Sequence, residues 1–334
     1  MSSPRYALVV TTINPPNEAL TMLADGASRL DARFWVIGDT KSPADFALPG
    51  ADYLDVPTQQ ASGFGFARAC PTKHYARKNI GYLLAMRDGA DVIVETDDDN
   101  LPRDGFWAPR ERHVAAPMLS GQGWCNVYRH FSEALIWPRG LPLDRVHDPL
   151  GPLSLAADPL DCPIQQGLAD DNPDVDAVYR LLLPLPQSFG PGTVILDRGT
   201  WCPFNSQNTT TFRPAFPLLY LPAHCSFRMT DIWRSFVAQR IAWANGWRVM
   251  FHGSTVWQER NAHDLMRDFA DEVPGYLHND RIRATLEDLD ITGGEAAMPD
   301  DLMRCYRALI ALGVVGAEEE ALVAAWNEDL ARLA

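Results

Sequence analysis

The sequence predicts an α/β fold with a mixed, mostly parallel sheet and flanking helices, and three observations support that prediction. Short apolar runs rich in β-branched residues alternate with segments of helical periodicity through the first hundred residues. Polar clusters follow three of those runs, at the strand ends where parallel sheets collect their ligands. The 334 residues are 46% hydrophobic and 22% charged, which suits a large core and argues against a disordered chain.

The elements of the first half follow one another as strand, helix, strand, strand, helix, strand. Tyr6 begins a buried strand, the prolines at positions 15 and 16 end it before Asn17, and Gly89 ends the second helix. The expected strands are residues 6–13, 34–37, 51–56 and 91–95, and the expected helices are residues 17–27 and 71–89.

The second half gives a weaker pattern. From Leu101 to about Phe227 prolines interrupt the sequence and no period is clean, so we expect long ordered loops there. A helix at 229–243 and a strand at 247–251 follow. From Asp280 to the end the sequence is amphipathic and predicts a helical C-terminal extension that packs on the rest of the chain.

Composition excludes several classes of partner and compartment. The formal net charge of −14 repels nucleic acid, so we expect no nucleic-acid partner. None of the six cysteines forms a C-x-x-C pair, which favours reduced thiols in a reducing compartment. The apolar start of the chain is short and lacks a signal-peptide pattern, and no segment is long enough to span a bilayer. We therefore expect a cytoplasmic protein without a transmembrane segment.

The acidic run Asp97-Asp98-Asp99 is the strongest chemical signal. It follows the apolar strand DVIVE, and hard divalent cations prefer carboxylate oxygens. Such an ion would act as a Lewis acid on the leaving phosphate of a nucleotide diphosphate. The alternative is a solvated acidic turn, which is common in a chain this acidic.

Further candidates lie on the predicted helices and strand ends. Arg77 and Lys78 form a basic pair that could reach phosphate oxygens or could be a solvated helix face. Asp39 could accept hydrogen bonds from a base or ribose, or could stabilise a turn. Asp231 is the candidate general base, although an aspartate at a helix start is often only a cap. His252 could be a third metal ligand or a structural histidine.

Eight sequence blocks between Tyr6 and His263 carry a family resemblance. They are residues 35–43 (WVIGDTKSP), 78–82 (KNIGY), 95–100 (ETDDDN), 136–143 (IWPRGLPL), 167–170 (GLAD), 173–177 (PDVDA), 204–208 (FNSQN) and 227–233 (FRMTDIW). In this order they resemble the STELLO-type glycosyltransferases. The PDVDA and TDIW segments are also similar to reversibly glycosylated polypeptides, which act as UDP-arabinopyranose mutases.

Both resemblances imply a GT-A fold, a UDP-sugar donor and Mn²⁺ or Mg²⁺ at the aspartate run. They divide the chain into a nucleotide-sugar-binding half at residues 1–110, an acceptor and catalytic half at 111–265, and a helical extension at 266–334. The plant STELLO proteins are anchored in the Golgi membrane, and no anchor is evident in this sequence, so their cellular role does not transfer to it.

The chemistry of the residues predicts a role for each candidate. Asp97 and Asp99 hold the metal together with His252, while Asp98 meets the ribose or a neighbouring basic group. Arg77 and Lys78 neutralise phosphate, and Asp231 serves as base, which predicts inversion at the anomeric carbon. The remaining donor contacts are Thr11, Thr12, Ile13, Asp39 and Lys41.

The predicted activity is sugar transfer from a nucleotide-diphosphate sugar, UDP-linked, to a glycan or small-molecule acceptor. One alternative is a mutase that interconverts ring forms of a UDP-sugar without an acceptor. Another is a sugar nucleotidyltransferase, which is disfavoured because Asn14-Pro15-Pro16 replaces the usual glycine-rich loop. A third is a nucleotide-sugar-binding protein without turnover.

Overall fold

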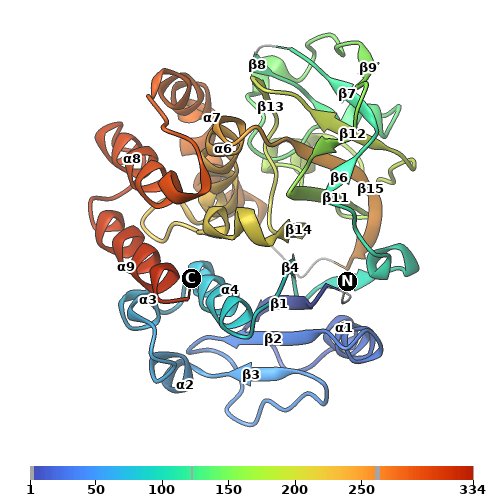
Figure 1. The fold of residues 1–334 in the computed structure, drawn as a ribbon. Coiled ribbons are helices and arrows are strands. Elements are labelled where there is room, and N and C mark those ends of the chain that lie inside the picture. The colour runs from blue at the N-terminus through green and yellow to red at the C-terminus, as the bar shows by residue number, and fades with distance from the viewer. Residues whose placement is uncertain (1–3, 122, 260–263, 334) are drawn as a thin grey trace.

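One eleven-stranded sheet runs through the computed structural model, which describes residues 4–121, 123–259 and 264–333 (Figure 1). Ten strands form a continuous path, and the eleventh, β5 (Asn100–Pro102), pairs with β15. In spatial order the ten are β3 (Asp52–Leu54), β2 (Arg33–Gly38), β1 (Tyr6–Thr12), β4 (Val92–Thr96), β14 (Asn208–Phe212), β11 (Ile164–Asp170), β15 (Val249–Gln258), β12 (Thr193–Leu196), β7 (Pro117–Leu119) and β9 (Leu153–Leu155).

The first four strands are all parallel, as the alternating pattern predicts. Helix α1 (Glu18–Arg29) covers one face, and its start is fixed by the side chain of Asn17, which accepts the N–H of Leu20. Helix α4 (Lys78–Arg87) covers the other face of β1 and β2 (Figure 1). Gly81 allows this close packing, because a Cβ there would lie 2.4 Å from the side chain of Val9. Alternate residues of β1 therefore enter two different apolar cores.

The region between residues 101 and 227 is more regular than the sequence predicts. Two of its strands, β11 and β14, lie in the centre of the sheet and are buried along their whole length. Their sequences, IQQGLAD and NTTTF, are polar, so no hydrophobic period marks them. The polar side chains bond one another instead: the Thr209 hydroxyl donates to Gln166 Oε1 at 2.9 Å. The expectation of long loops is corrected for these two strands and holds for residues 131–142 and 183–192, which contain no named helix or strand.

The remaining helices gather on one side of the molecule (Figure 1). They comprise α2 (Val56–Gln60), α3 (Gly65–Ala69), α5 (Ala177–Leu182), α6 (Thr230–Ala244), α7 (Leu265–Asp288), α8 (Met298–Ala311) and α9 (Glu319–Ala331). The predicted packing of the C-terminal helices is present, because Asp329 on α9 accepts the N–H groups of Gly65 and Phe66 at 3.0 and 2.8 Å.

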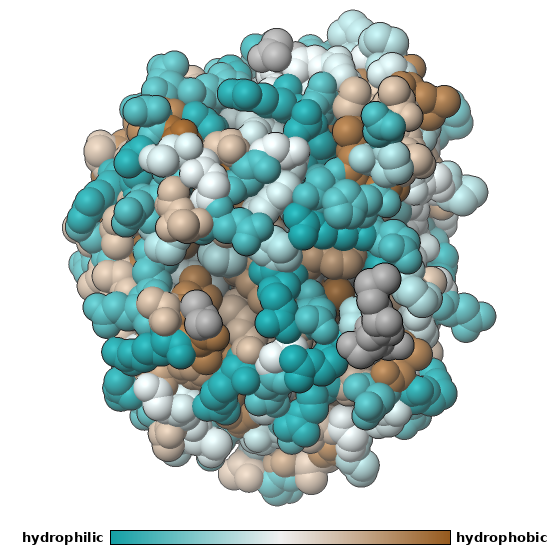
Figure 2. Space-filling view, in the orientation of Figure 1, coloured by the Kyte–Doolittle hydropathy of each residue, from teal (hydrophilic) through white to brown (hydrophobic). Residues whose placement is uncertain are grey.

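The surface seen in Figure 2 is largely hydrophilic, with small groups of hydrophobic side chains. Edge strand β9 exposes Leu153 and Leu155. Among the described residues no helix combines the length and the apolar character needed to cross a bilayer. The division into three segments expected from the sequence stays a prediction, since a single sheet includes strands from both of the first two segments.

Candidate functional site

A cleft with a volume of about 960 Å³ opens at the carboxyl ends of β1, β2 and β4. Three predicted clusters meet there: residues 11–14 after β1, residues 37–41 after β2, and the acidic run after β4. The start of α6, with Asp231, and the start of α7 form the opposite wall. The structure thus brings together most of the residues that the sequence singles out. Those that line the cleft are Thr11, Thr12, Ile13, Asp39, Lys41, Arg77, Asp97, Asp98, Asp99 and Asp231.

The three aspartates of the acidic run have three different partners. Asp98 turns toward β1, where its carboxylate accepts hydrogen bonds from the Thr12 hydroxyl at 2.5 Å and the Asn14 amide at 3.0 Å. It therefore holds the loop after β1. In the described chain the partners of Asp98 are these polar groups, not a basic residue, which corrects one of the two expectations for it.

Asp97 is paired with a buried lysine. Its Oδ1 lies 3.1 Å from Lys78 Nζ and also accepts the Tyr75 hydroxyl at 3.2 Å. Burial raises the pKa of Asp97 to about 7, and the charges of Asp98 and Asp99 add to the rise, while Lys78 opposes it. A cation beside this carboxylate would favour its ionised form.

Asp99 completes the run on the side of β15. Its Oδ1 accepts the side-chain amide of Gln258 at 3.0 Å. Asp97 and Asp99 supply hard oxygen donors suited to Mg²⁺ or Mn²⁺. Within the described residues no group of three or more His, Cys, Asp or Glu side chains could hold a metal ion. Two carboxylates fit a cation whose other ligands are water and a diphosphate.

His252 does not reach this site, so its expected role as third ligand is corrected. It lies on β15 six residues before Gln258, and it does not line the cleft. The ring is buried, with Nδ1 2.9 Å from the carbonyl of Gly253. Burial, with the nearby charge of Arg110, lowers the pKa of His252 to about 4. The sequence places it at a strand end, but β15 continues to Gln258.

Arg77 and Lys78, the basic pair at the start of α4, have two different roles. Lys78 is fully buried and does not line the cleft; its Nζ donates to the carbonyls of Thr96 and Ser206 at 2.7 and 3.1 Å. Its expected contact with phosphate is therefore corrected: it is the counter-ion of Asp97. Arg77 is buried too, but it touches the cleft, and its Nη2 has no hydrogen-bond partner in the described part of the chain.

The carboxylate of Asp231, in the first turn of α6, is held by an arginine that sequence analysis passed over. Arg139 Nη2 lies 2.9 Å from Asp231 Oδ2, and the same guanidinium binds Asp174 through two hydrogen bonds of 2.7 and 2.8 Å. Burial alone would raise the pKa of Asp174, but the ion pair with Arg139 outweighs it and leaves that pKa lowered. All three residues line the cleft.

Tyr75 and Ser206 connect the acidic run to Asp231. The Tyr75 hydroxyl lies within hydrogen-bonding distance of both Asp97 and the Ser206 hydroxyl. Ser206 in turn contacts Asp231 Oδ2, at 3.4 Å through its N–H. Phe227 packs edge-on against Tyr75 with ring centroids 6.4 Å apart and is 53% exposed in the cleft. A large exposed aromatic in a polar cleft is a natural platform for a sugar face.

Comparison with known proteins finds two curated relatives and one family model. A family model described as STELLO glycosyltransferases matches residues 228–334, which include Asp231. The chain is 28% identical to "Probable glycosyltransferase STELLO2" of Arabidopsis thaliana over 97% of its own length and 44% of that protein. It is also 28% identical to "Probable glycosyltransferase STELLO1" of the same plant over 74% of its length and 34% of that protein. The chain is therefore similar to the STELLO glycosyltransferases over most of its length.

The chain spans less than half the length of the two curated relatives that it matches. Its mixed α/β architecture, with a largely parallel central sheet and flanking helices, is consistent with a GT-A-like glycosyltransferase fold. Two of the residues that the sequence left without a role, Arg139 and Asp174, lie in the IWPRGLPL and PDVDA blocks that carry the resemblance. Membership of those blocks was the one signal that pointed to them.

Proposed function

We propose that this chain transfers a sugar from a UDP-sugar to a hydroxyl group of an acceptor, with Mn²⁺ or Mg²⁺ bound at Asp97 and Asp99. One observation carries the proposal. A single cleft holds a pair of metal-binding carboxylates at one end and the carboxylate of Asp231 at the other, linked through Tyr75 and Ser206. The proposed donor site at Asp97 and Asp99 and the proposed acceptor site at Asp231 thereby share one cleft.

The part of the cleft at the carboxyl ends of β1 and β2 suits a uracil base. Asp39 accepts the backbone N–H groups of Thr40 and His74, at 2.6 and 2.9 Å, and so its carboxylate is held in place. The unpartnered Nη2 of Arg77 is a buried donor beside it. A carboxylate acceptor next to a guanidinium donor matches the imino N–H and carbonyl of uracil, because each buried polar group then gains a partner.

The acidic run suits the diphosphate. A divalent cation bound there supplies charge neutralisation for the phosphate that leaves. Lys78 fixes Asp97 Oδ1, which keeps that side chain in one position. Lys41 lines the same cleft, next to Asp39, and adds positive charge near the donor.

Asp231 suits the acceptor. Arg139 holds its carboxylate in place through hydrogen bonds, so it can take the proton of an acceptor hydroxyl as that oxygen bonds to the anomeric carbon. The bond between the anomeric carbon and the phosphate oxygen breaks with its electron pair going to UDP. A single displacement of this kind inverts the anomeric centre.

The test is turnover of a panel of UDP-sugars with and without Mn²⁺ and acceptors, followed by NMR of the product. Metal-dependent release of UDP with an inverted glycosidic product supports the proposal. A retained anomer refutes the role of Asp231 as base in a single displacement. An isomerised sugar in the donor-only reaction indicates a mutase, and UDP binding without any turnover indicates a binding protein; either result replaces sugar transfer.

A further inference from the structure

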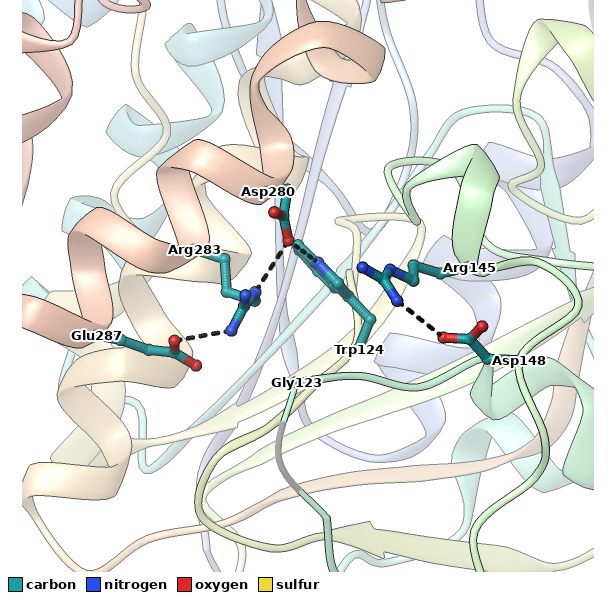
Figure 3. A pocket seen from close by; sticks show the side chains of 7 residues that line it. All are labelled: Gly123, Trp124, Arg145, Asp148, Asp280, Arg283 and Glu287. Atoms are coloured by element: carbon teal, nitrogen blue, oxygen red, sulfur yellow. Dashed lines mark hydrogen bonds and ion pairs between the residues drawn. The ribbon is translucent and has the colours of Figure 1, made fainter.

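A second hollow, of about 290 Å³, lies beside α7 (Figure 3). Its lining residues come from strand β8 (Gly123–Trp124), from the end of the short helix η4 (Leu143–Arg145) and the segment after it, and from α7. Asp271 of α7 faces the cleft and Asp280 faces this hollow. They are separated by about two and a half helical turns, or about 14 Å along the axis, and so point to opposite sides. The two cavities share no lining residue.

On the wall of the hollow across from α7, Arg145 offers unused hydrogen-bond donors. The guanidinium of Arg145 lies 3.6 Å from Asp144 and 3.7 Å from Asp148, beyond hydrogen-bonding distance. It therefore makes ion pairs but no hydrogen bond within the described residues, and its side chain is 45% exposed. Figure 3 shows this guanidinium turned toward Trp124 from across the hollow.

On the wall formed by α7, Asp280 offers an unused hydrogen-bond acceptor. Asp280 Oδ1 accepts both the indole N–H of Trp124 at 2.9 Å and Arg283 Nε at 3.2 Å. Oδ2 of the same carboxylate receives no hydrogen bond from the described chain. Arg283 also bonds Glu287 at 2.7 Å, so the α7 side is held rigidly by pairs along its own helix. No hydrogen bond or ion pair between described residues joins Arg145 to α7 across the hollow.

The charges of the lining select the kind of ligand. The lining has two positive side chains, Arg145 and Arg283, and three negative ones, Asp148, Asp280 and Glu287. An anion in the hollow would therefore meet more negative than positive charge. A bare metal ion is disfavoured too, because the described residues hold no group of three metal-binding side chains. A neutral ligand that donates and accepts at once satisfies both sides, and hydroxyl groups do so.

Trp124 supplies the apolar part of the lining. Its ring is anchored against Phe236, with centroids 5.2 Å apart, and its indole N–H is held by Asp280. An indole fixed in this way presents a rigid surface to the C–H face of a sugar ring. We propose that this hollow is a saccharide-binding site, separate from the cleft, which binds a neutral oligosaccharide between Arg145 and Asp280 with Trp124 as its apolar contact.

The test measures binding of neutral tetrasaccharides to the full chain by saturation-transfer NMR and calorimetry, with cellotetraose, xylotetraose, laminaritetraose and maltotetraose as probes. At least one should bind saturably. Arg145→Ala and Asp280→Asn should each weaken it about fivefold, the effect of one hydrogen bond worth about 1 kcal/mol. Both side chains are exposed at the surface, and unchanged thermal melting of the variants confirms folding.

Two control variants make the result specific. Arg29→Ala removes an exposed arginine at the end of α1 and should leave binding unchanged. Asp99→Ala alters the cleft and should also leave it unchanged, which separates this site from the proposed donor site. The proposal is overturned if no probe binds, if both Arg145→Ala and Asp280→Asn bind normally, or if only Asp99→Ala abolishes binding.

Discussion

Replacing Lys78 with methionine should destabilise the fold strongly, because it leaves Asp97 without its counter-ion. The Lys78 side chain is 0% exposed, and its ammonium group donates to two carbonyls and to Asp97 Oδ1. Removing one partner of a buried ion pair costs about 3–5 kcal/mol, and methionine fills much of the same volume. We expect the free energy of unfolding to fall by that amount.

Urea denaturation at pH 8, followed by circular dichroism, measures this loss. The informative partner is the double variant Lys78→Met with Asp97→Asn, which removes both charges and should recover about 2 kcal/mol or more of the loss. Arg29→Met is the exposed control and should change stability by less than about 0.5 kcal/mol. A loss below about 1 kcal/mol for Lys78→Met, or no recovery in the double variant, would refute the assignment of Lys78 as the counter-ion of Asp97.

Three further predictions concern ligands and pH. Arg77→Met should weaken UMP binding about 10- to 150-fold in calorimetry, because a charged hydrogen bond contributes about 1.5–3 kcal/mol, and equal loss for CMP would contradict uracil recognition. Asp231→Asn should lower kcat by about 10²–10⁴ and leave the Kd for UDP unchanged; an unchanged kcat would exclude it as base. The pKa of His252 is lowered to about 4. Since the unfolded chain then binds more protons between pH 4 and the ordinary pKa of about 6.5, the free energy of unfolding should rise with pH by at most about 3 kcal/mol, and His252→Gln should flatten that rise in urea titrations.

The first four strands and α1 could be predicted because their signals are local. Each carries its own hydrophobic period, and Asn17 supplies a cap within the same segment. The central strands β11 and β14 could not, because their glutamines and threonines are satisfied only after the strands meet. Thr209 and Gln166, for example, are 43 positions apart.

In the site, too, features with a local sequence signal could be predicted, and those made by long-range contacts could not. The convergence of residues 11–14, 37–41 and 97–99 could be predicted, since parallel strands end at one edge. The ion pair of Arg139 with Asp231 joins residues 92 positions apart and has no local signature. His252 was misplaced for a simpler reason: the apolar run ends at Phe251, but β15 continues to Gln258 by pairing with β5. Its far end, not its middle, meets Asp99.

The three different partners of the acidic run explain why nucleotide and metal should bind together. Lys78 already neutralises Asp97, and Thr12 and Asn14 hold Asp98, so the run presents less free negative charge than three adjacent aspartates suggest. A cation alone gains little there, whereas a cation with UDP gains the phosphate oxygens as ligands. By reciprocity UDP must raise the affinity for Mn²⁺ by the same factor as Mn²⁺ raises the affinity for UDP. The thermal shift with Mn²⁺ and UDP together should therefore exceed the sum of the shifts with Mn²⁺ alone and UDP alone, and Asp99→Ala should remove the excess. Additive shifts would mean that the metal and the nucleotide do not share a site.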